Sequence, residues 1–93
     1  SILIHSIRYA VGAQGDETGS VAGPYCEKTI KSTGAGDRFN SGYALGRVLD
    51  LHLNDRLVLA CASSGFFVRT GYSASLPELA EFLTNPEVWE SAA

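Results

Sequence analysis

The stretch KSTGAGDRFNSG, residues 31–42, decides how the rest of this chain is organised. Two glycines flank an alanine, an aspartate follows at once, and an apolar helical pattern begins directly behind them. Such a loop points backbone N–H groups and the positive end of a helix dipole at one spot. The sequence therefore predicts an anion site at the GAG loop, which consists of Gly34, Ala35 and Gly36, with the carboxylate of Asp37 beside it.

Asp37 has two interpretations. A lone carboxylate would repel a bound phosphate, so it needs another task, and accepting a proton from an attacking hydroxyl is the obvious candidate. In the alternative, the glycines only form a tight turn, and Asp37 complements the dipole in the first helical turn. A strand-rich segment before the loop and a buried helix after it favour the first interpretation.

Size and composition restrict the class of protein. The 93 residues are enough for one small domain, and 45% hydrophobic content with 18% charged content is too apolar for disorder. The apolar runs are too short to span a bilayer, and no signal peptide is visible. The net charge of −3, without a basic cluster, argues against a nucleic-acid partner.

The cysteines and the first residues indicate the setting of the chain. Cys26 and Cys61 lack partners at metal-ligand spacing, so we expect no metal site. Cys61 lies in an apolar helical pattern and is expected to be a small buried hydrophobe, which suits a reducing, cytoplasmic setting. The chain has no methionine and begins with Ser1 in an apolar run, which indicates a piece of a longer protein. An engineered or processed start would also explain the missing methionine.

The hydrophobic pattern predicts strands followed by helices. We expect strands at an edge of a sheet over residues 1–5, 9–13 and 20–22, with a polar loop over 14–19. Helices are expected over residues 35–51 and 55–70, the second with Asn54 as its N-cap and Gly71 just after its end. Ser75 and Glu78 form a capping box that starts a short helix ending near Leu83, and residues 85–89 form another turn or short helix.

Small residues on the two long helices predict close packing. Gly42 and Gly46 each cost about 1 kcal/mol relative to alanine, so we expect another backbone close to that side of the first helix. The small-residue run over 60–65 admits either another helix or a flat ring, and helix packing is favoured. His5 ends the first strand, where a structural role is favoured over a ligand role.

Residues 31–44 resemble the C-terminal signature of the ribokinase-like (phosphofructokinase-B type) family of sugar and nucleoside kinases. Members typically read D-T-x-G-A-G-D-x-F here, followed by small residues. VRTG at 68–71 and SLP at 75–77 are more loosely similar to the family's V-T-R-x-G-A…S-x-P stretch. The resemblance implies an α/β fold, with residues 1–93 as a single partial domain: the C-terminal, nucleotide-binding portion of a three-layer α/β/α architecture.

The resemblance also implies an activity. It is the ATP-dependent transfer of a γ-phosphoryl group to a hydroxyl of a sugar or nucleoside-like acceptor. The GAG loop would be the anion hole and Asp37 the general base. Mg²⁺ would accompany ATP, without a dedicated ligand in this chain. Ala60 and Ser64 fall where the family's adenine pocket is lined, which implies a mixed role for their helix, with one side packing and the other facing the nucleotide.

The chain departs from the family pattern at two points. Members often begin the signature with an aspartate that helps to hold a monovalent cation, whereas Lys31 or Ser32 stands here. Either the ammonium of Lys31 replaces a potassium ion, which would make activity potassium-independent, or Lys31 simply faces solvent. Members also have a T-L-G turn that touches the nucleotide, and this chain has HSI at residues 5–7.

Three functions stay open on these grounds. The chain is the C-terminal portion of a kinase, a non-catalytic nucleotide- or phosphate-binding module, or a structural α/β domain in which the loop is only a turn and cap. The acceptor is open among fructose, ribose, a deoxy-keto sugar acid and a nucleoside. Because the family's sugar-binding residues and lid lie in an N-terminal part, we expect the chain alone to be inactive and any homodimer to form through that part. Neither a nucleic-acid nor a membrane partner is expected.

Overall fold

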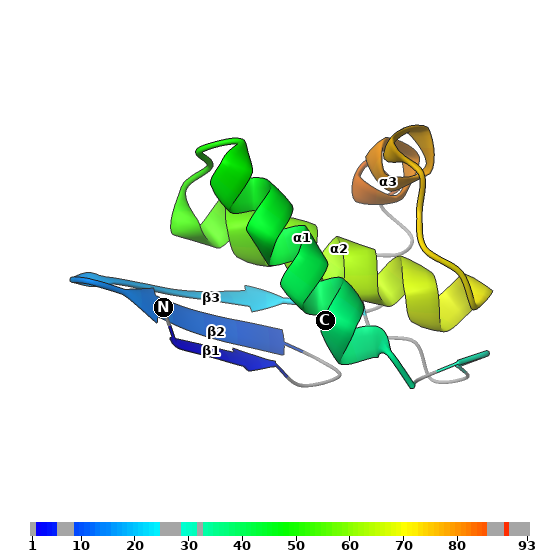
Figure 1. Ribbon diagram of the computed structural model, residues 1–93, viewed down its shortest axis with the longest axis horizontal. Helices are drawn as coiled ribbons and strands as arrows, with labels where there is room; N and C mark the ends of the chain where they lie inside the picture. Colours follow the sequence, from blue (N-terminus) through cyan, green and yellow to red (C-terminus); the bar gives the residue numbers. More distant parts are fainter. Residues whose placement is uncertain (1, 6–8, 25–28, 32, 86–88, 90–93) are drawn as a thin grey trace.

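The computed structural model describes residues 2–5, 9–24, 29–31, 33–85 and 89. In this part of the chain, strands come first and helices follow (Figure 1): β1 (Ile2–His5), β2 (Tyr9–Gln14), β3 (Glu17–Ala22), α1 (Ala35–Val48), α2 (Leu53–Thr70) and α3 (Leu76–Leu83). The predicted α/β class is confirmed at this level. Cys26, Ser6, Ile7 and most of the predicted turn over 85–89 lie outside the described residues.

The strands form an antiparallel sheet in the order β1-β2-β3. Gln14 pairs with Glu17, and the two residues between them close a hairpin in which Gly15 has a φ of +59°. The prediction of a polar loop over 14–19 was therefore wrong, because β3 begins at Glu17. The residues of β3 are polar because one face of the strand meets solvent: Glu17, Thr18 and Ser20 all lie at the surface.

Helix α2 is the centre of the molecule. It contacts α1, α3, β2 and β3, and α1 and α2 cover the same face of the sheet (Figure 1). The core has two parts, one between the sheet, α1 and α2, and one between α2 and α3. The first contains Ala10, Phe39, Tyr43, Leu53, Leu57, Ala60 and Cys61, and the second contains Leu59, Ala62, Phe66, Leu79 and Phe82. The predicted burial of Cys61 is confirmed, and burial raises the pKa of its thiol to about 11.

The two long helices pack backbone against backbone, as their glycines predict. A Cβ atom added at Gly42 would lie 2.8 Å from the Cα of Ala60 and 2.8 Å from the carbonyl oxygen of Leu59. One added at Gly46 would lie 3.1 Å from the Cα of Arg56. These distances are shorter than ordinary van der Waals contact, so only glycine fits at the crossing of α1 and α2.

Two predicted helix boundaries were wrong. Helix α2 begins at Leu53, with His52 rather than Asn54 as its N-cap and no side-chain capping bond. Leu53 is buried in the core, and this burial outweighs the capping preference of Asn54. Helix α1 ends at Val48 instead of residue 51, because Asp50 adopts a left-handed φ of +57°.

Two other helix termini match the sequence. Gly71 follows α2 with a φ of +84°, and its N–H donates to the carbonyl of Phe67 at 2.7 Å. At the start of α3, the N–H of Glu78 donates to the Ser75 hydroxyl and the N–H of Ser75 donates to the Glu78 carboxylate. The predicted capping box is therefore confirmed.

Within the described ranges, no helix combines the length and the apolar character that crossing a membrane requires.

Candidate functional site

The GAG loop leads directly into α1, as the sequence predicts. Gly34 has a φ of +96° and is the N-cap of α1, which begins at Ala35. The N–H of Arg38 donates to the carbonyl of Gly34 at 3.2 Å, so the first intrahelical bond closes over the loop. The N–H groups of Ala35, Gly36 and Asp37 belong to the first turn, where a helix leaves its donors without intrahelical partners. They are oriented to serve an external acceptor.

The loop is open to solvent on the side that a ligand would approach. Gly36 and Asp37 are exposed, whereas Gly34 and Ala35 are half-buried. A Cβ atom built at Gly36 would meet no heavy atom within 4 Å. The carboxylate of Asp37 therefore stands at the surface next to the helix N-terminus, the arrangement on which the base hypothesis depends. Anion binding and proton transfer here stay predictions.

Two cations flank the loop. Lys31, which precedes it, is exposed, and its Nζ lies 5.8 Å from the ring centroid of Phe67. Arg38, which follows it, places its guanidinium carbon 4.4 Å from the same centroid, and its Nε donates to the Ser73 hydroxyl at 3.1 Å. The positive potential at the helix N-terminus is thereby increased from both sides. The replacement of a potassium ion by Lys31 stays a prediction.

The segment before the loop is fixed to α2. The N–H of Ile30 donates to the carbonyl of Val68 at 2.8 Å, and the N–H of Lys31 approaches the same oxygen at 3.5 Å. These bonds hold the entry to the loop against the last turns of α2, close to Gly71. The loop therefore has a defined place relative to α2 as well as α1.

Ala60 and Ser64 lie apart from the exposed loop surface. Ala60 is 0% exposed and Ser64 is 5% exposed. Ala60 belongs to the core cluster with Phe39 and Tyr43, directly under Gly42 of α1. The interpretation as tight helix packing is confirmed for Ala60, and the nucleotide-lining role of both residues stays a prediction.

His5 joins β1 to α1. Its imidazole is stacked on the ring of Phe39, with centroids 4.1 Å apart and an interplanar angle of 14°. Phe39 is two residues after Asp37 and is buried, so the stack packs the end of β1 against the first turns of α1. The structural interpretation of His5 agrees with this contact.

His5 is expected to make stability depend on pH. Burial lowers the pKa of His5 below its ordinary 6.5, so the folded chain keeps it neutral where the unfolded chain is already protonated. The stabilisation is present above pH 6.5 and is lost as the pH falls through the lowered pKa. We expect urea unfolding to show this loss as the pH falls below 6.5, and a smaller loss in His5→Phe, which keeps a stacked ring without titrating.

The matched control is His52→Gln, because His52 is exposed at the start of α2. Comparing the two variants separates the effect of the stacked imidazole of His5 from that of simply removing a histidine. If His5→Phe loses as much stability on acidification as the unsubstituted chain, the stack with Phe39 does not perturb His5.

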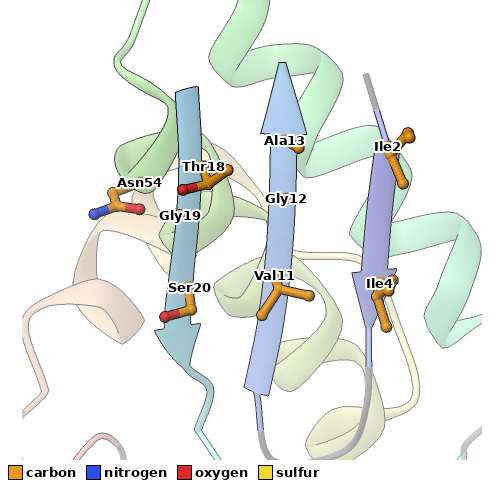
Figure 2. A pocket seen from close by; sticks show the side chains of 9 residues that line it. All are labelled: Ile2, Ile4, Val11, Gly12, Ala13, Thr18, Gly19, Ser20 and Asn54. Atoms are coloured by element: carbon orange, nitrogen blue, oxygen red, sulfur yellow. The ribbon is translucent and has the colours of Figure 1, made fainter. Parts of the chain in front are cut away.

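One cavity lies away from the GAG loop. It is a hollow of about 610 Å³ on the face of the sheet opposite α1 and α2, shown in Figure 2. The labelled side chains of Ile2, Ile4, Val11, Thr18 and Ser20 line it. Its lining contains no charged side chain, so it does not suit a triphosphate. Among the described residues, no group of three or more His, Cys, Asp and Glu side chains could hold a metal ion.

Comparisons with known proteins agree on one family. A protein-family model described as prokaryotic ketohexokinase matches residues 1–85. The ketohexokinase of Haloferax volcanii is 42% identical over 65 residues, which make up 70% of this chain and 17% of that protein. The match thus spans less than a fifth of the length of this curated relative. No solved structure matches the chain.

Proposed function

The chain belongs to the prokaryotic ketohexokinase family, and we propose that it is the C-terminal, nucleotide-holding part of a kinase that phosphorylates a ketohexose with ATP. The observation that carries the proposal is the GAG loop, which opens α1 with the N–H groups of a first helical turn and an exposed Asp37. A nucleotide-binding loop alone would not need a carboxylate beside its anion site. A kinase needs a base at that place.

In this proposal the loop and Asp37 divide the chemistry between them. The N–H groups at the start of α1 stabilise the charge on the γ-phosphoryl group, and because they are fixed by the helix they need no reorganisation during transfer. Asp37 accepts the proton of the sugar hydroxyl as its oxygen attacks phosphorus. Mg²⁺ would enter with ATP and, when bound, would supply positive charge that neutralises the phosphates.

We further propose the three-layer α/β/α architecture for the whole kinase. The uncovered face of the sheet supports it, because Ile2 and Ile4 are 71% and 59% exposed there (Figure 2). A third layer on this face would remove both side chains from water. The acceptor would be held by the part of the kinase beyond this chain, which would also supply homodimer contacts. A cytoplasmic location completes the proposal.

The test is an acceptor panel with the complete kinase, ATP and Mg²⁺. We expect D-fructose to have a kcat/KM at least about tenfold above those of ribose, a deoxy-keto sugar acid and a nucleoside. ADP release coupled to NADH oxidation measures the rates. Tight ATP binding without transfer to any acceptor would instead support the non-catalytic module. The structural domain would be supported if neither ATP binding nor transfer is found.

Lys31 leads to a separate prediction about monovalent cations. If its ammonium supplies the charge of a potassium ion, kcat should agree within about two-fold in potassium chloride and in choline chloride of equal ionic strength. Lys31→Asp should create potassium dependence, because it replaces a fixed cation by a carboxylate that needs one. A several-fold rise in the activity of the unsubstituted kinase with potassium would show that Lys31 is not a substitute.

A further inference from the structure

One buried ring lies under both cations that flank the GAG loop. Phe67 in α2 is 2% exposed, and the charged groups of Lys31 and Arg38 lie 5.8 and 4.4 Å from its centroid. A cation within about 6 Å of a ring centroid is attracted by the negative face of the ring. Because Lys31 comes just before the loop and Arg38 just after it, Phe67 attracts both ends of the loop.

Arg38 has two further contacts with its surroundings. Its Nε donates to the hydroxyl of Ser73, in the segment between α2 and α3, at 3.1 Å. A Cβ atom at Gly34 would lie 3.4 Å from Nη1 of Arg38 and 3.5 Å from Cζ of Phe67, so Gly34 fits against both groups. One side chain thus joins the GAG loop, the end of α2 and the segment that leads to α3.

The contacts of Arg38 act on the first turn of α1, to which it belongs. Successive residues in an α-helix are about 100° apart around its axis. When the side chain of Arg38 is held on Phe67 and Ser73, the direction of the neighbouring Asp37 is set as well. The N–H groups of the loop turn with the same helical turn. A displacement of about 1 Å at a reacting group can lower a rate about 10²-fold.

We infer that Arg38 is a positioning residue for phosphoryl transfer, which aims Asp37 and the GAG loop through its contacts with Phe67 and Ser73. The inference rests on the proposed function and adds a residue that the signature G-A-G-D-x-F leaves unspecified. It differs from a structural role in what is lost. Replacing a structural arginine lowers the stability of the fold, whereas replacing a positioning arginine lowers the turnover of enzyme that is still folded.

The experiment compares Arg38→Met and Arg38→Lys in the complete kinase. Met keeps the length of the side chain without charge or donor, and we expect kcat to fall about 10- to 100-fold with little change in the KM of the sugar. Lys keeps a cation over Phe67, so it should recover part of the lost kcat. Arg47→Met is the matched control, because Arg47 is exposed in the last turn of the same helix. Thermal unfolding shows whether each variant is folded.

Ser73→Ala tests the same contact from the other side. It should lower kcat several-fold. Combined with Arg38→Met it should lower kcat little further, because both substitutions remove the same interaction. This variant decides the matter if Arg38→Met does not fold. Unchanged kcat in Ser73→Ala and in folded Arg38→Met, or equal losses in Arg38→Met and Arg47→Met, would overturn the inference. An unsubstituted kinase that phosphorylates no sugar would overturn the proposed function instead.

Discussion

Replacing Asp37 by asparagine in the complete kinase is expected to lower kcat about 10²- to 10⁴-fold, the usual contribution of a general base. Asparagine has nearly the same shape and leaves the backbone N–H groups of the GAG loop in place, but it cannot accept the proton of the sugar hydroxyl. The Kd of ATP should therefore change by no more than about three-fold. A coupled assay measures kcat, and isothermal titration measures the Kd.

Asp55→Asn is the matched control for this prediction. Asp55 is an exposed aspartate in the first turn of α2, as Asp37 is in the first turn of α1. The same loss of charge at a second helix N-terminus should leave kcat unchanged. If Asp37→Asn keeps turnover within a few-fold, Asp37 only complements the helix dipole and another group is the base.

The second large effect is expected at Gly42, where alanine should destabilise the fold by about 1–3 kcal/mol. Alanine usually stabilises a helix by about 1 kcal/mol relative to glycine, so the sign of the change in the free energy of unfolding is itself informative. The reason is that the new Cβ would lie 2.8 Å from backbone atoms of both Ala60 and Leu59, which cannot move without separating α1 from α2. Urea unfolding of the chain measures the change.

Gly36→Ala is the control on the same helix. Its Cβ would meet no heavy atom within 4 Å, and Gly36 lies inside α1. Its stability should therefore be equal to that of the unsubstituted chain or higher by up to about 1 kcal/mol. If Gly42→Ala is as stable as Gly36→Ala, the backbones of α1 and α2 are not in direct contact at Gly42.

Features fixed by local chemistry were predictable from the sequence. The start of α1 at Ala35 and the helix end at Gly71 depend on glycine conformations, and the capping box of Ser75 and Glu78 needs only four adjacent residues. Where tertiary packing competes with local preference, the predictions were wrong. Burial of Leu53 moved the start of α2 away from Asn54.

Only the part of the candidate site that is contiguous in sequence was predictable. The GAG loop and Asp37 are contiguous, so their arrangement follows from the start of one helix. The contacts of Arg38 with Phe67 and Ser73 join segments that are far apart in sequence, and no periodicity or motif predicts such contacts. The burial of Ala60 under α1 likewise follows from the packing of two helices, which brings a backbone over a face that could also admit a ring.

We propose that this chain contributes the anion loop and the base of a sugar kinase. The most direct measurement is ³¹P NMR of the complete kinase with ATP, Mg²⁺ and D-fructose. We predict a sugar phosphomonoester resonance that grows in step with ADP and grows at least about 10²-fold more slowly for Asp37→Asn. ATP that stays intact, or that yields ADP and inorganic phosphate without a phosphomonoester, would contradict the claim.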